Sequence, residues 1–292
     1  MFRTRLISGI ILVIIALAAI LAGGGVLAAV LCFISLAAYR ELAKACGIHT
    51  EEGKCSAPEW AGMIMTVIYY AALAAALYMG EENGDRLAPA YPTVLAAVAL
   101  GLILFLFVYV FTFPKYKANQ IMTAMFSWLY GPLMLSFIYL IREGFEYGAY
   151  LTGFIFLCSW GSDTCAYSVG VLIGKHKMTP KLSPKKSVEG AVGGVLGAAV
   201  LFVLYTHFAV NRYAGADIPL LLSAVLGGAG ALVSMVGDLA ASAIKRDHEI
   251  KDYGKLIPGH GGIMDRFDSV IIAAPLIFIG LVVIVGVGGV TL

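Results

Sequence analysis

The chain has 292 residues, of which 60% are hydrophobic and 13% are charged; its formal net charge is +2 and its mean hydropathy is +0.90. A soluble protein carries about 25% charged residues, so this composition excludes a soluble globular domain and indicates an integral membrane protein. So small a net charge gives no sign of a nucleic-acid partner, and membrane lipids are the expected surroundings.

Nine apolar stretches are each long enough for a transmembrane helix, which needs roughly 20 residues. They cover about residues 5–22, 24–43, 60–79, 92–113, 121–141, 149–174, 189–210, 217–241 and 264–290. The sequence therefore predicts an all-α polytopic membrane protein with about nine transmembrane helices in one integral membrane unit. Within it, we expect residues 1–145 to form a scaffold and residues 146–292 to carry the functional signature.

The first apolar stretch resembles a secretory signal peptide, because Arg3 and Arg5 precede it. Its apolar run is longer than the roughly 7–15 residues typical of a signal peptide, so we expect a retained helix; cleavage would leave the remaining topology unchanged. The run Gly23–Gly25 predicts a tight hairpin with the second stretch. Cysteines 32, 46, 55, 158 and 165 form no CxxC pair, and we expect free thiols.

Lysine and arginine residues are unevenly distributed between alternate loops, which indicates the orientation of the chain. The N-terminus and the segments after the second, fourth, sixth and eighth spans hold 17 of the 20 basic residues, and the remaining ones are Arg86, Arg142 and Arg212. This bias predicts a cytoplasmic N-terminus and an external C-terminus. It also places the polar clusters described below towards the cytoplasmic face.

Carboxylates gather at the cytoplasmic ends of the last two spans. Asp238 ends the eighth span, and Asp265 and Asp268 share one face at the start of the ninth. Such acids near lipid need cations to balance their charge, and hard oxygen ligands suit Mg²⁺. For Asp265 and Asp268, compensation of the helix dipole is the alternative. Asp163 lies inside the sixth span, roughly 18 Å of helix before Lys175. It is a further candidate ligand, with a structural polar contact as the alternative.

Hydroxyl and basic side chains accompany the acid that ends the eighth span. Asp238, Ser242 and Lys245 recur at i, i+4 and i+7, and they would form one stripe if the helix continued beyond the membrane. Such a stripe could present a metal ligand, a hydroxyl and an ammonium group to one ligand. A frayed and solvated helix end is the alternative.

Two further segments have the composition of phosphate-binding sites. The glycine-rich segment Gly259–Gly262 would let backbone N–H groups approach an anion just before a helix. Lys185 and Lys186 precede Ser187, a predicted N-cap with Glu189 in the first helical turn. The positive-inside rule also predicts basic residues at a cytoplasmic helix end. Spacing alone therefore does not decide between this rule and a phosphate-binding site.

Taken together, these residues resemble the signature of the phosphatidate cytidylyltransferases, the CDP-diacylglycerol synthases. The pattern reads Ser242-x2-Lys245-Arg246-x4-Lys251-Asp252-x5-Pro258-x-His260-Gly261-Gly262-x2-Asp265-Arg266-x-Asp268. A second block of that family resembles Asp163-x2-Ala166-Tyr167 and Ser183-Pro184-Lys185-Lys186-Ser187-x-Glu189-Gly190. The resemblance covers roughly residues 155–270, with Tyr39-Arg40-Glu41-Leu42 as a familiar segment before it. Mild departures are Ala241, where many relatives carry Glu, and Ser187, where Thr is common.

The resemblance implies a reaction of CTP with phosphatidate that gives CDP-diacylglycerol and pyrophosphate, in a plasma membrane of the bacterial inner-membrane type and facing the cytoplasm. It implies catalytic roles for Asp238, Lys245, Asp265 and Asp268. It implies substrate binding by Lys185, Lys186, Ser187, Ser242, Arg246, His260, Gly261, Gly262 and Arg266. Mg²⁺, as two divalent ions or as one divalent and one monovalent cation, would be held by Asp163, Asp238, Asp265 and Asp268. A homodimer is compatible with the sequence.

Two other functions stay open on the residues alone. A CTP-dependent lipid or polyprenol kinase would transfer the γ-phosphoryl group instead, and an ion-coupled transporter would also place acids in the membrane. The acids cluster at one face and the sequence shows no inverted repeat, which disfavours a transporter. Product analysis separates the three functions: a CDP-lipid with pyrophosphate, a phosphorylated lipid with CDP, or no turnover.

We predict that a cysteine introduced at position 84 or 213 reacts with an impermeant thiol reagent added to intact cells, whereas one at 183 or 255 does not. The reason is the basic asymmetry, which places the first two positions outside and the last two inside. The measurement uses a background without the five native cysteines, before and after permeabilisation. Labelling of position 255 from outside would contradict the cytoplasmic assignment.

Overall fold

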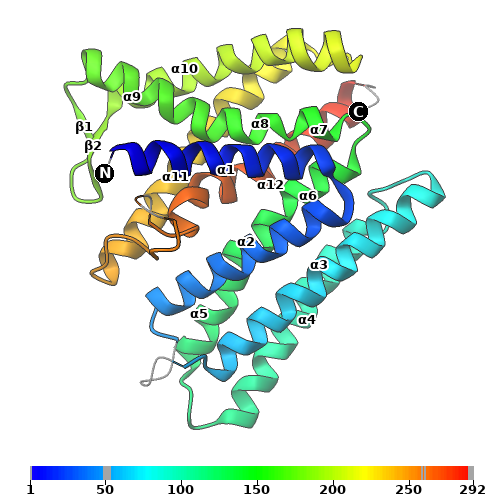
Figure 1. Ribbon diagram of the computed structural model, residues 1–292, viewed down its shortest axis with the longest axis vertical. Coiled ribbons are helices and arrows are strands. Elements are labelled where there is room, and N and C mark those ends of the chain that lie inside the picture. Colours follow the sequence, from blue (N-terminus) through cyan, green and yellow to red (C-terminus); the bar gives the residue numbers. More distant parts are fainter. Residues whose placement is uncertain (1, 49–53, 258, 260, 289–292) are drawn as a thin grey trace. The chain divides into compact units, whose positions relative to one another are not determined.

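The computed structural model describes residues 2–48, 54–257, 259 and 261–288. The chain forms two compact units: unit 1 contains residues 1–144 and 248–266, and unit 2 contains residues 145–247 and 267–292. Helices make up nearly all of both units, which confirms the predicted all-α polytopic membrane fold (Figure 1). The segment 248–266, which holds much of the predicted signature, belongs to the N-terminal unit.

Unit 1 is built mainly from long helices. They are α1 (Phe2–Ala22), α2 (Gly24–Ala45), α3 (Ala57–Asn83), α4 (Ala90–Thr112), α5 (Ala118–Trp128), the π-helical turn η1 (Leu129–Leu133) and α6 (Met134–Gly144). α3 packs against both α2 and α4 (Figure 1). The side chains of Tyr39, Tyr69 and Trp128 are almost completely buried in this unit, and the Tyr69 hydroxyl lies 2.7 Å from Ser136 Oγ. Aromatic side chains thus fill the core, and the Tyr69 hydroxyl has a hydrogen-bond partner there.

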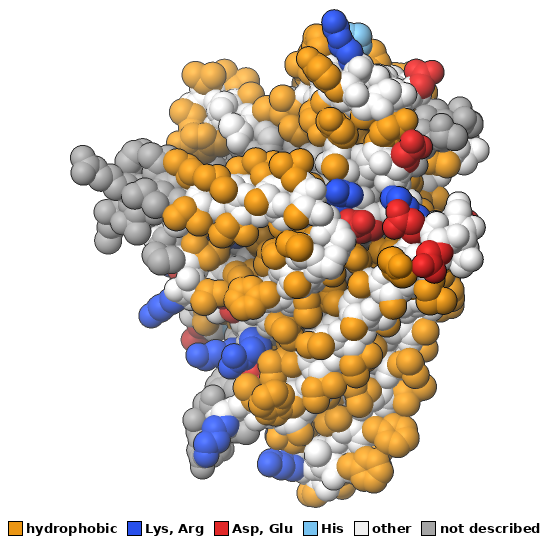
Figure 2. Space-filling view, turned by 45° about the vertical axis from the view of Figure 1, so that its right-hand side comes forward, with side chains coloured by type: hydrophobic (Ala, Val, Ile, Leu, Met, Phe, Trp, Pro, Cys, Tyr) orange, Lys and Arg blue, Asp and Glu red, His pale blue; other side chains and the backbone are white. Residues whose placement is uncertain are grey.

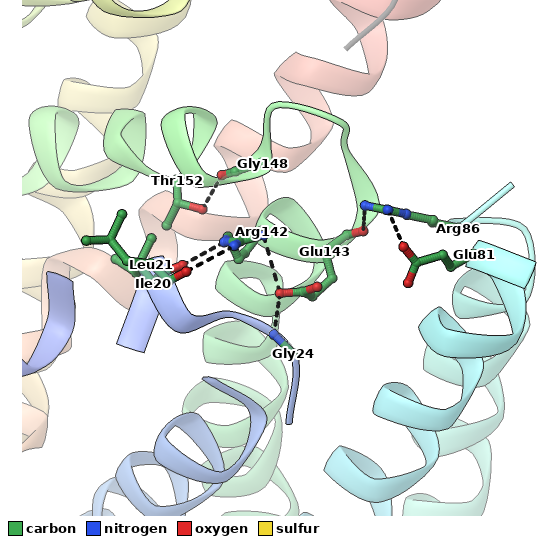
Figure 3. A network of polar contacts seen from close by, with 9 residues as sticks. All are labelled: Ile20, Leu21, Gly24, Glu81, Arg86, Arg142, Glu143, Gly148 and Thr152. Atoms are coloured by element: carbon green, nitrogen blue, oxygen red, sulfur yellow. Dashed lines mark hydrogen bonds and ion pairs between the residues drawn. The ribbon is translucent and has the colours of Figure 1, made fainter. Parts of the chain in front are cut away.

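The end of α6 holds the turn between α1 and α2 (Figure 3). Arg142 Nε donates to the carbonyl oxygen of Ile20 at 2.6 Å, and the Gly24 N–H donates to Glu143 Oε1 at 2.8 Å. A helix ends in unpaired carbonyl groups and begins with unpaired N–H groups, which carry partial negative and positive charge. The cation therefore caps the end of α1 and the carboxylate caps the start of α2. The predicted tight turn is confirmed, since Gly23 alone separates the two helices.

Unit 2 contains a small β-hairpin among its helices. The elements are α7 (Gly148–Leu151), α8 (Gly153–Phe156), η2 (Leu157–Gly161), α9 (Ser162–Ile173), β1 (Lys177–Thr179), β2 (Ser183–Ser187), α10 (Val188–Tyr205), η3 (Thr206–Ala214), α11 (Leu220–Asp247) and α12 (Met264–Gly288), whose first residues belong to unit 1. α9 and α10 lie side by side (Figure 1). A β-carbon at Gly197 would lie 2.6 Å from the Cys165 side chain, so glycine permits this close approach.

The apolar stretches of the sequence correspond well to the helices. Seven described segments are long and apolar enough to cross a membrane, against about nine predicted, and the segment Ser8–Ala22 within α1 is a shorter apolar helix. Hydrophobic side chains cover most of the face seen in Figure 2, and charged side chains gather in a few groups. The predicted sixth span, residues 149–174, is interrupted at Thr152, whose Oγ1 donates to the Gly148 carbonyl at 2.7 Å. A hydroxyl bonded to the carbonyl four residues earlier tends to bend a helix.

The β1–β2 hairpin is the element that the sequence analysis did not predict. Its strands are antiparallel, with Lys177 opposite Ser187 and Thr179 opposite Ser183. The strands are three and five residues long, too short for an alternating pattern to be recognised. The hairpin carries the lysines that the sequence analysis placed simply at a helix entrance.

We expect Arg142→Gln to lower the free energy of unfolding by about 1–3 kcal/mol, because it removes a charge-assisted hydrogen bond to a helix end. The Arg142 side chain is only 20% exposed, so solvent screens this bond weakly. Denaturant unfolding of the purified protein in detergent provides the measurement.

Arg86→Gln is the control for this variant. Arg86 pairs with Glu81 near the protein surface (Figure 3), and exposed pairs contribute only about 0–1 kcal/mol. Arg86 also donates to the Glu143 carbonyl, but at 3.4 Å, so this bond is weaker than the 2.6 Å bond of Arg142 (Figure 3). Equal losses in the two variants would contradict the capping role of Arg142.

Candidate active site

Unit 2 encloses a cavity of about 500 Å³. Its charged and hydroxyl-bearing lining consists of Asp163, Tyr167, Lys177, Lys185, Lys186, Ser187 and Asp238. α9, the β-hairpin, α10 and α11 all contribute to it. The structure therefore brings together five residues that the sequence analysis selected from three separate segments. It adds Lys177, which lies outside the recognised motif and enters the cavity because β1 pairs with β2.

The base of the hairpin is fixed to the first turn of α10. The Gly190 N–H donates to Ser187 Oγ at 3.1 Å, which confirms Ser187 as the N-cap and Glu189 as part of the first turn. The Glu189 carboxylate accepts the N–H groups of Lys175 and His176 at 3.1 and 3.2 Å. It also lies 2.6 Å from His176 Nδ1. These bonds position the strand that carries Lys185 and Lys186.

An ion pair joins the hairpin to α11 inside the cavity. Lys186 Nζ pairs with Asp238 Oδ2, and the two side chains are 23% and 27% exposed. Asp163 lies close enough to be affected by both charges. Lys186 Nζ has no hydrogen-bond partner beyond this ion pair among the described residues. Two carboxylates therefore share one nearby ammonium group, an arrangement suited to a ligand that brings both anionic and cationic groups.

α11 continues past Asp238 to Asp247, as the predicted stripe required. Ser242 and Lys245 thus share a helical face with Asp238, and both side chains are half-buried. Arg246 is exposed. The residues from Ser242 to Arg246 do not line the cavity of unit 2. The structure confirms the stripe, and their contact with substrate stays a prediction.

Asp265, in unit 1, organises the loop that leads into α12. Its Oδ2 atom accepts the N–H groups of Tyr253 at 2.8 Å and Gly262 at 3.0 Å, and the residue is 7% exposed. Gly261 has a φ of +88°, a region that favours glycine. The Gly262 N–H, which the sequence analysis offered to a bound anion, is thus paired with a carboxylate of the chain itself. His260, another predicted site residue, lies outside the described residues.

Glu41 is a residue whose role the sequence analysis missed. Its Oε2 atom accepts the Met264 N–H at 2.9 Å and so caps the start of α12. A β-carbon at Gly254 would lie 2.7 Å from Glu41 Cδ, so the loop closes tightly around the carboxylate. The two bonded residues are 223 positions apart, which no local pattern reveals. The only signal was the familiar segment Tyr39-Arg40-Glu41-Leu42.

The remaining two predicted residues lie in the first turns of α12. Asp268 is 9% exposed, and its Oδ1 atom accepts the Ser269 N–H at 2.8 Å. Arg266 Nε is buried and has no hydrogen-bond partner among the described residues. A buried donor of a cationic group without a partner is costly. An anionic partner for Arg266 is therefore expected, which agrees with its predicted role in substrate binding.

The donor chemistry of the unit 2 cavity fits a divalent cation. Asp163 and Asp238 supply hard carboxylate oxygens beside lysines that can bind phosphate. Mg²⁺ is usually held by one or two carboxylates and completes its shell with water and substrate phosphates. Across the described residues, no three His, Cys, Asp or Glu side chains form a cluster able to hold a metal ion. A site in which two carboxylates and the substrate phosphates hold the cation agrees with the usual ligands of Mg²⁺ and with the absence of a three-residue cluster among the described residues.

We predict that Asp265→Asn lowers the free energy of unfolding by about 1–3 kcal/mol, because two charge-assisted bonds to backbone N–H groups are weakened. Faster limited proteolysis between residues 248 and 262 should accompany the loss. Asp252→Asn is the matched control, since Asp252 lies exposed in the same loop. A fully stable Asp265→Asn protein with an unchanged cleavage pattern would contradict this structural role.

Comparisons with known proteins bear on the family of the chain. The sequence model of the cytidylyltransferase family matches residues 3–284. Three similar proteins are phosphatidate cytidylyltransferases. That of Haemophilus influenzae is 38% identical over 129 residues, which are 44% of each chain, and that of Bacillus subtilis is 35% identical over 138 residues, which are 47% of this chain and 49% of the relative. That of Staphylococcus epidermidis is 42% identical over 123 residues, which are 42% of this chain and 45% of the relative. The chain thus spans about half the length of the curated relatives it matches. Because the family match extends over nearly all its residues, the chain belongs to the cytidylyltransferase family.

Proposed function

We propose that this integral membrane protein transfers the cytidylyl group of CTP to phosphatidate, giving CDP-diacylglycerol and pyrophosphate. The observation that carries the proposal is the cavity of unit 2, where Asp163 and Asp238 face lysines of the hairpin. The family match and the named activity of the three relatives support the same reaction. A soluble polyanion and a membrane lipid must meet in this reaction, which suits a cationic cavity built from membrane helices.

The lysines of the cavity would bind the triphosphate. Lys177, Lys185 and Lys186 come from both strands of the hairpin, so their ammonium groups can approach phosphates from different sides. Ser187 starts α10, and the partial positive charge of a helix start also favours phosphate. The further substrate-binding residues proposed from the family signature are Ser242, Lys245, Arg246, His260, Gly261, Gly262 and Arg266.

The reaction needs no nucleophile from the protein. A phosphate oxygen of phosphatidate attacks the α-phosphorus of CTP, and a new P–O bond forms there. The bond between the α-phosphorus and the oxygen that bridges to the β-phosphate breaks, and pyrophosphate leaves with the bonding electron pair. Lys185 and Lys186 stabilise the charge that develops on the leaving group.

Asp163 and Asp238 are the proposed ligands of Mg²⁺ in the cavity. The bound ion would neutralise negative charge on the transferred and leaving phosphates. The carboxylates of Asp265 and Asp268 stay proposed ligands on the strength of the family signature, as does a second cation, divalent or monovalent. The cavity is proposed to face the cytoplasm of a bacterial-type inner membrane, since the basic residues gather on that side.

A test of the reaction uses the purified full-length chain with labelled CTP and phosphatidate in mixed micelles. We expect a labelled CDP-lipid and unlabelled pyrophosphate when the label is in the cytidine. Formation of CDP together with a phosphorylated lipid would replace the proposal by a kinase. No Mg²⁺-dependent turnover of CTP by the folded protein would overturn it.

We predict that Lys185→Ala combined with Lys186→Ala raises the apparent KM for CTP roughly tenfold or more, and raises that for phosphatidate less, because two charge-assisted phosphate contacts are lost. Steady-state kinetics with each substrate varied in turn provide the measurement. Lys181→Ala is the control, since Lys181 lies exposed in the turn of the same hairpin and does not line the cavity. An unchanged KM for CTP in the folded double variant would remove these lysines from the nucleotide site.

A further inference from the structure

Unit 1 contains a second charged cavity, which the proposed reaction does not use. Its volume is about 450 Å³, and it lies between the end of α2, the start of α3 and the loop at 253–256. Its charged lining consists of Arg40, Glu41, Lys44, Glu59 and Lys255. Basic residues outnumber acidic ones there, although positive-inside bias alone would account for isolated lysines.

Both acids of this cavity are already engaged in the fold. Glu59 is 4% exposed, forms a capping box with Ser56, and lies 3.6 Å from Arg40 Nε. Glu41 accepts the Met264 N–H as the cap of α12. Because these bonds hold the two carboxylates, they are poor partners for the remaining cations.

Lys44 and Lys255 are the basic residues of this cavity other than Arg40, which pairs with Glu59. Neither side chain has an acidic partner or a hydrogen bond among the described residues, and both residues are exposed at the cavity. They come from α2 and from the loop before α12, so they approach the cavity from two separate segments. Two ammonium groups that line one cavity, with no acidic partner among the residues that the structure describes, favour an anion.

The position of the cavity points to a lipid as the source of that anion. α2 and α3 are both membrane-spanning helices, and the cavity lies where one ends and the other begins. Trp60, in the first turn of α3, is 55% exposed, and Leu256, which lines the cavity, is 56% exposed. Exposed tryptophans are typical of the membrane–water interface, where lipid head groups lie. An exposed leucine next to a lysine whose side chain has no partner among the described residues suits a ligand with an apolar and an anionic part.

We propose that this cavity binds the phosphate head group of an anionic membrane glycerophospholipid through Lys44 and Lys255, with the acyl chains towards Leu256 and Trp60. Phosphate is the recognised group, and free phosphate in solution is the other source of the same chemistry. The proposal goes beyond cytidylyl transfer, because it needs neither CTP nor turnover. Failure of one proposal therefore leaves the other standing.

The experiment is native mass spectrometry of the purified full-length chain in detergent, titrated without nucleotide. The probes are phosphatidylglycerol, which is anionic and is not the proposed substrate, phosphatidylcholine, which is zwitterionic, and inorganic phosphate. We expect the protein to prefer phosphatidylglycerol. Lys44→Gln combined with Lys255→Gln should weaken that binding roughly 30-fold, from the usual contribution of each lysine near an anionic membrane.

Two further variants separate charge from fold. Lys115→Gln combined with Lys117→Gln removes two charges from exposed lysines before α5 and should leave the preference intact. Lys44→Arg combined with Lys255→Arg keeps both charges and should retain binding. Equal binding of phosphatidylglycerol by the Lys44/Lys255 and Lys115/Lys117 glutamine variants would overturn the site. Inorganic phosphate that binds as tightly as the lipid would overturn the assignment to a lipid.

Discussion

The structure depends on the pairing of backbone groups at helix ends, because little water reaches such groups in and near a bilayer. Charged side chains satisfy these groups at several junctions: Arg142 at the end of α1, Glu143 at the start of α2, Glu189 at the base of the hairpin and Glu41 at the start of α12. Each cap fixes a turn or a polar segment to a helix. The functional side chains lie on those segments, so the caps determine where the chemistry can take place.

The same constraint distinguishes acids that are bonded to backbone N–H groups from acids that are not. Asp265 and Glu41 accept backbone N–H groups, and a change of partner would require the loop before α12 to rearrange. Among the described residues, Asp163 and Asp238 accept no backbone hydrogen bond, and Asp238 pairs with a lysine side chain. A lysine can change partners by rotation of its own side chain. The unit 2 cavity therefore has the carboxylates that can most easily bind a cation.

Sequence alone predicted what depends on local pattern and missed what depends on distant contacts. Hydropathy located most of the spans, and the capping role of Ser187 followed from helix-end preferences. The continuation of α11 past Asp238 was one of two alternatives that periodicity left open, and the structure selects it. The hairpin was missed because its strands are short and polar, and Lys177 was missed with it. Glu41 could not be assigned, because its partner Met264 is 223 residues away. The family signature selected two carboxylates that the structure places in the unit 2 cavity, although it could not show which acids serve as caps.

In the proposed reaction, Lys186 has two roles that it cannot fill at the same time. Its ammonium group balances the charge of Asp238, without which that half-buried carboxylate would be costly. The same group is suited to the triphosphate of CTP, whose charge competes with Asp238 for it. A nucleotide that arrived with a divalent cation would resolve this competition, because Asp238 would bind the cation and Lys186 the phosphates. The ion pair would thus give a physical reason for nucleotide and cation to bind together, and in their absence it balances the charge of Asp238.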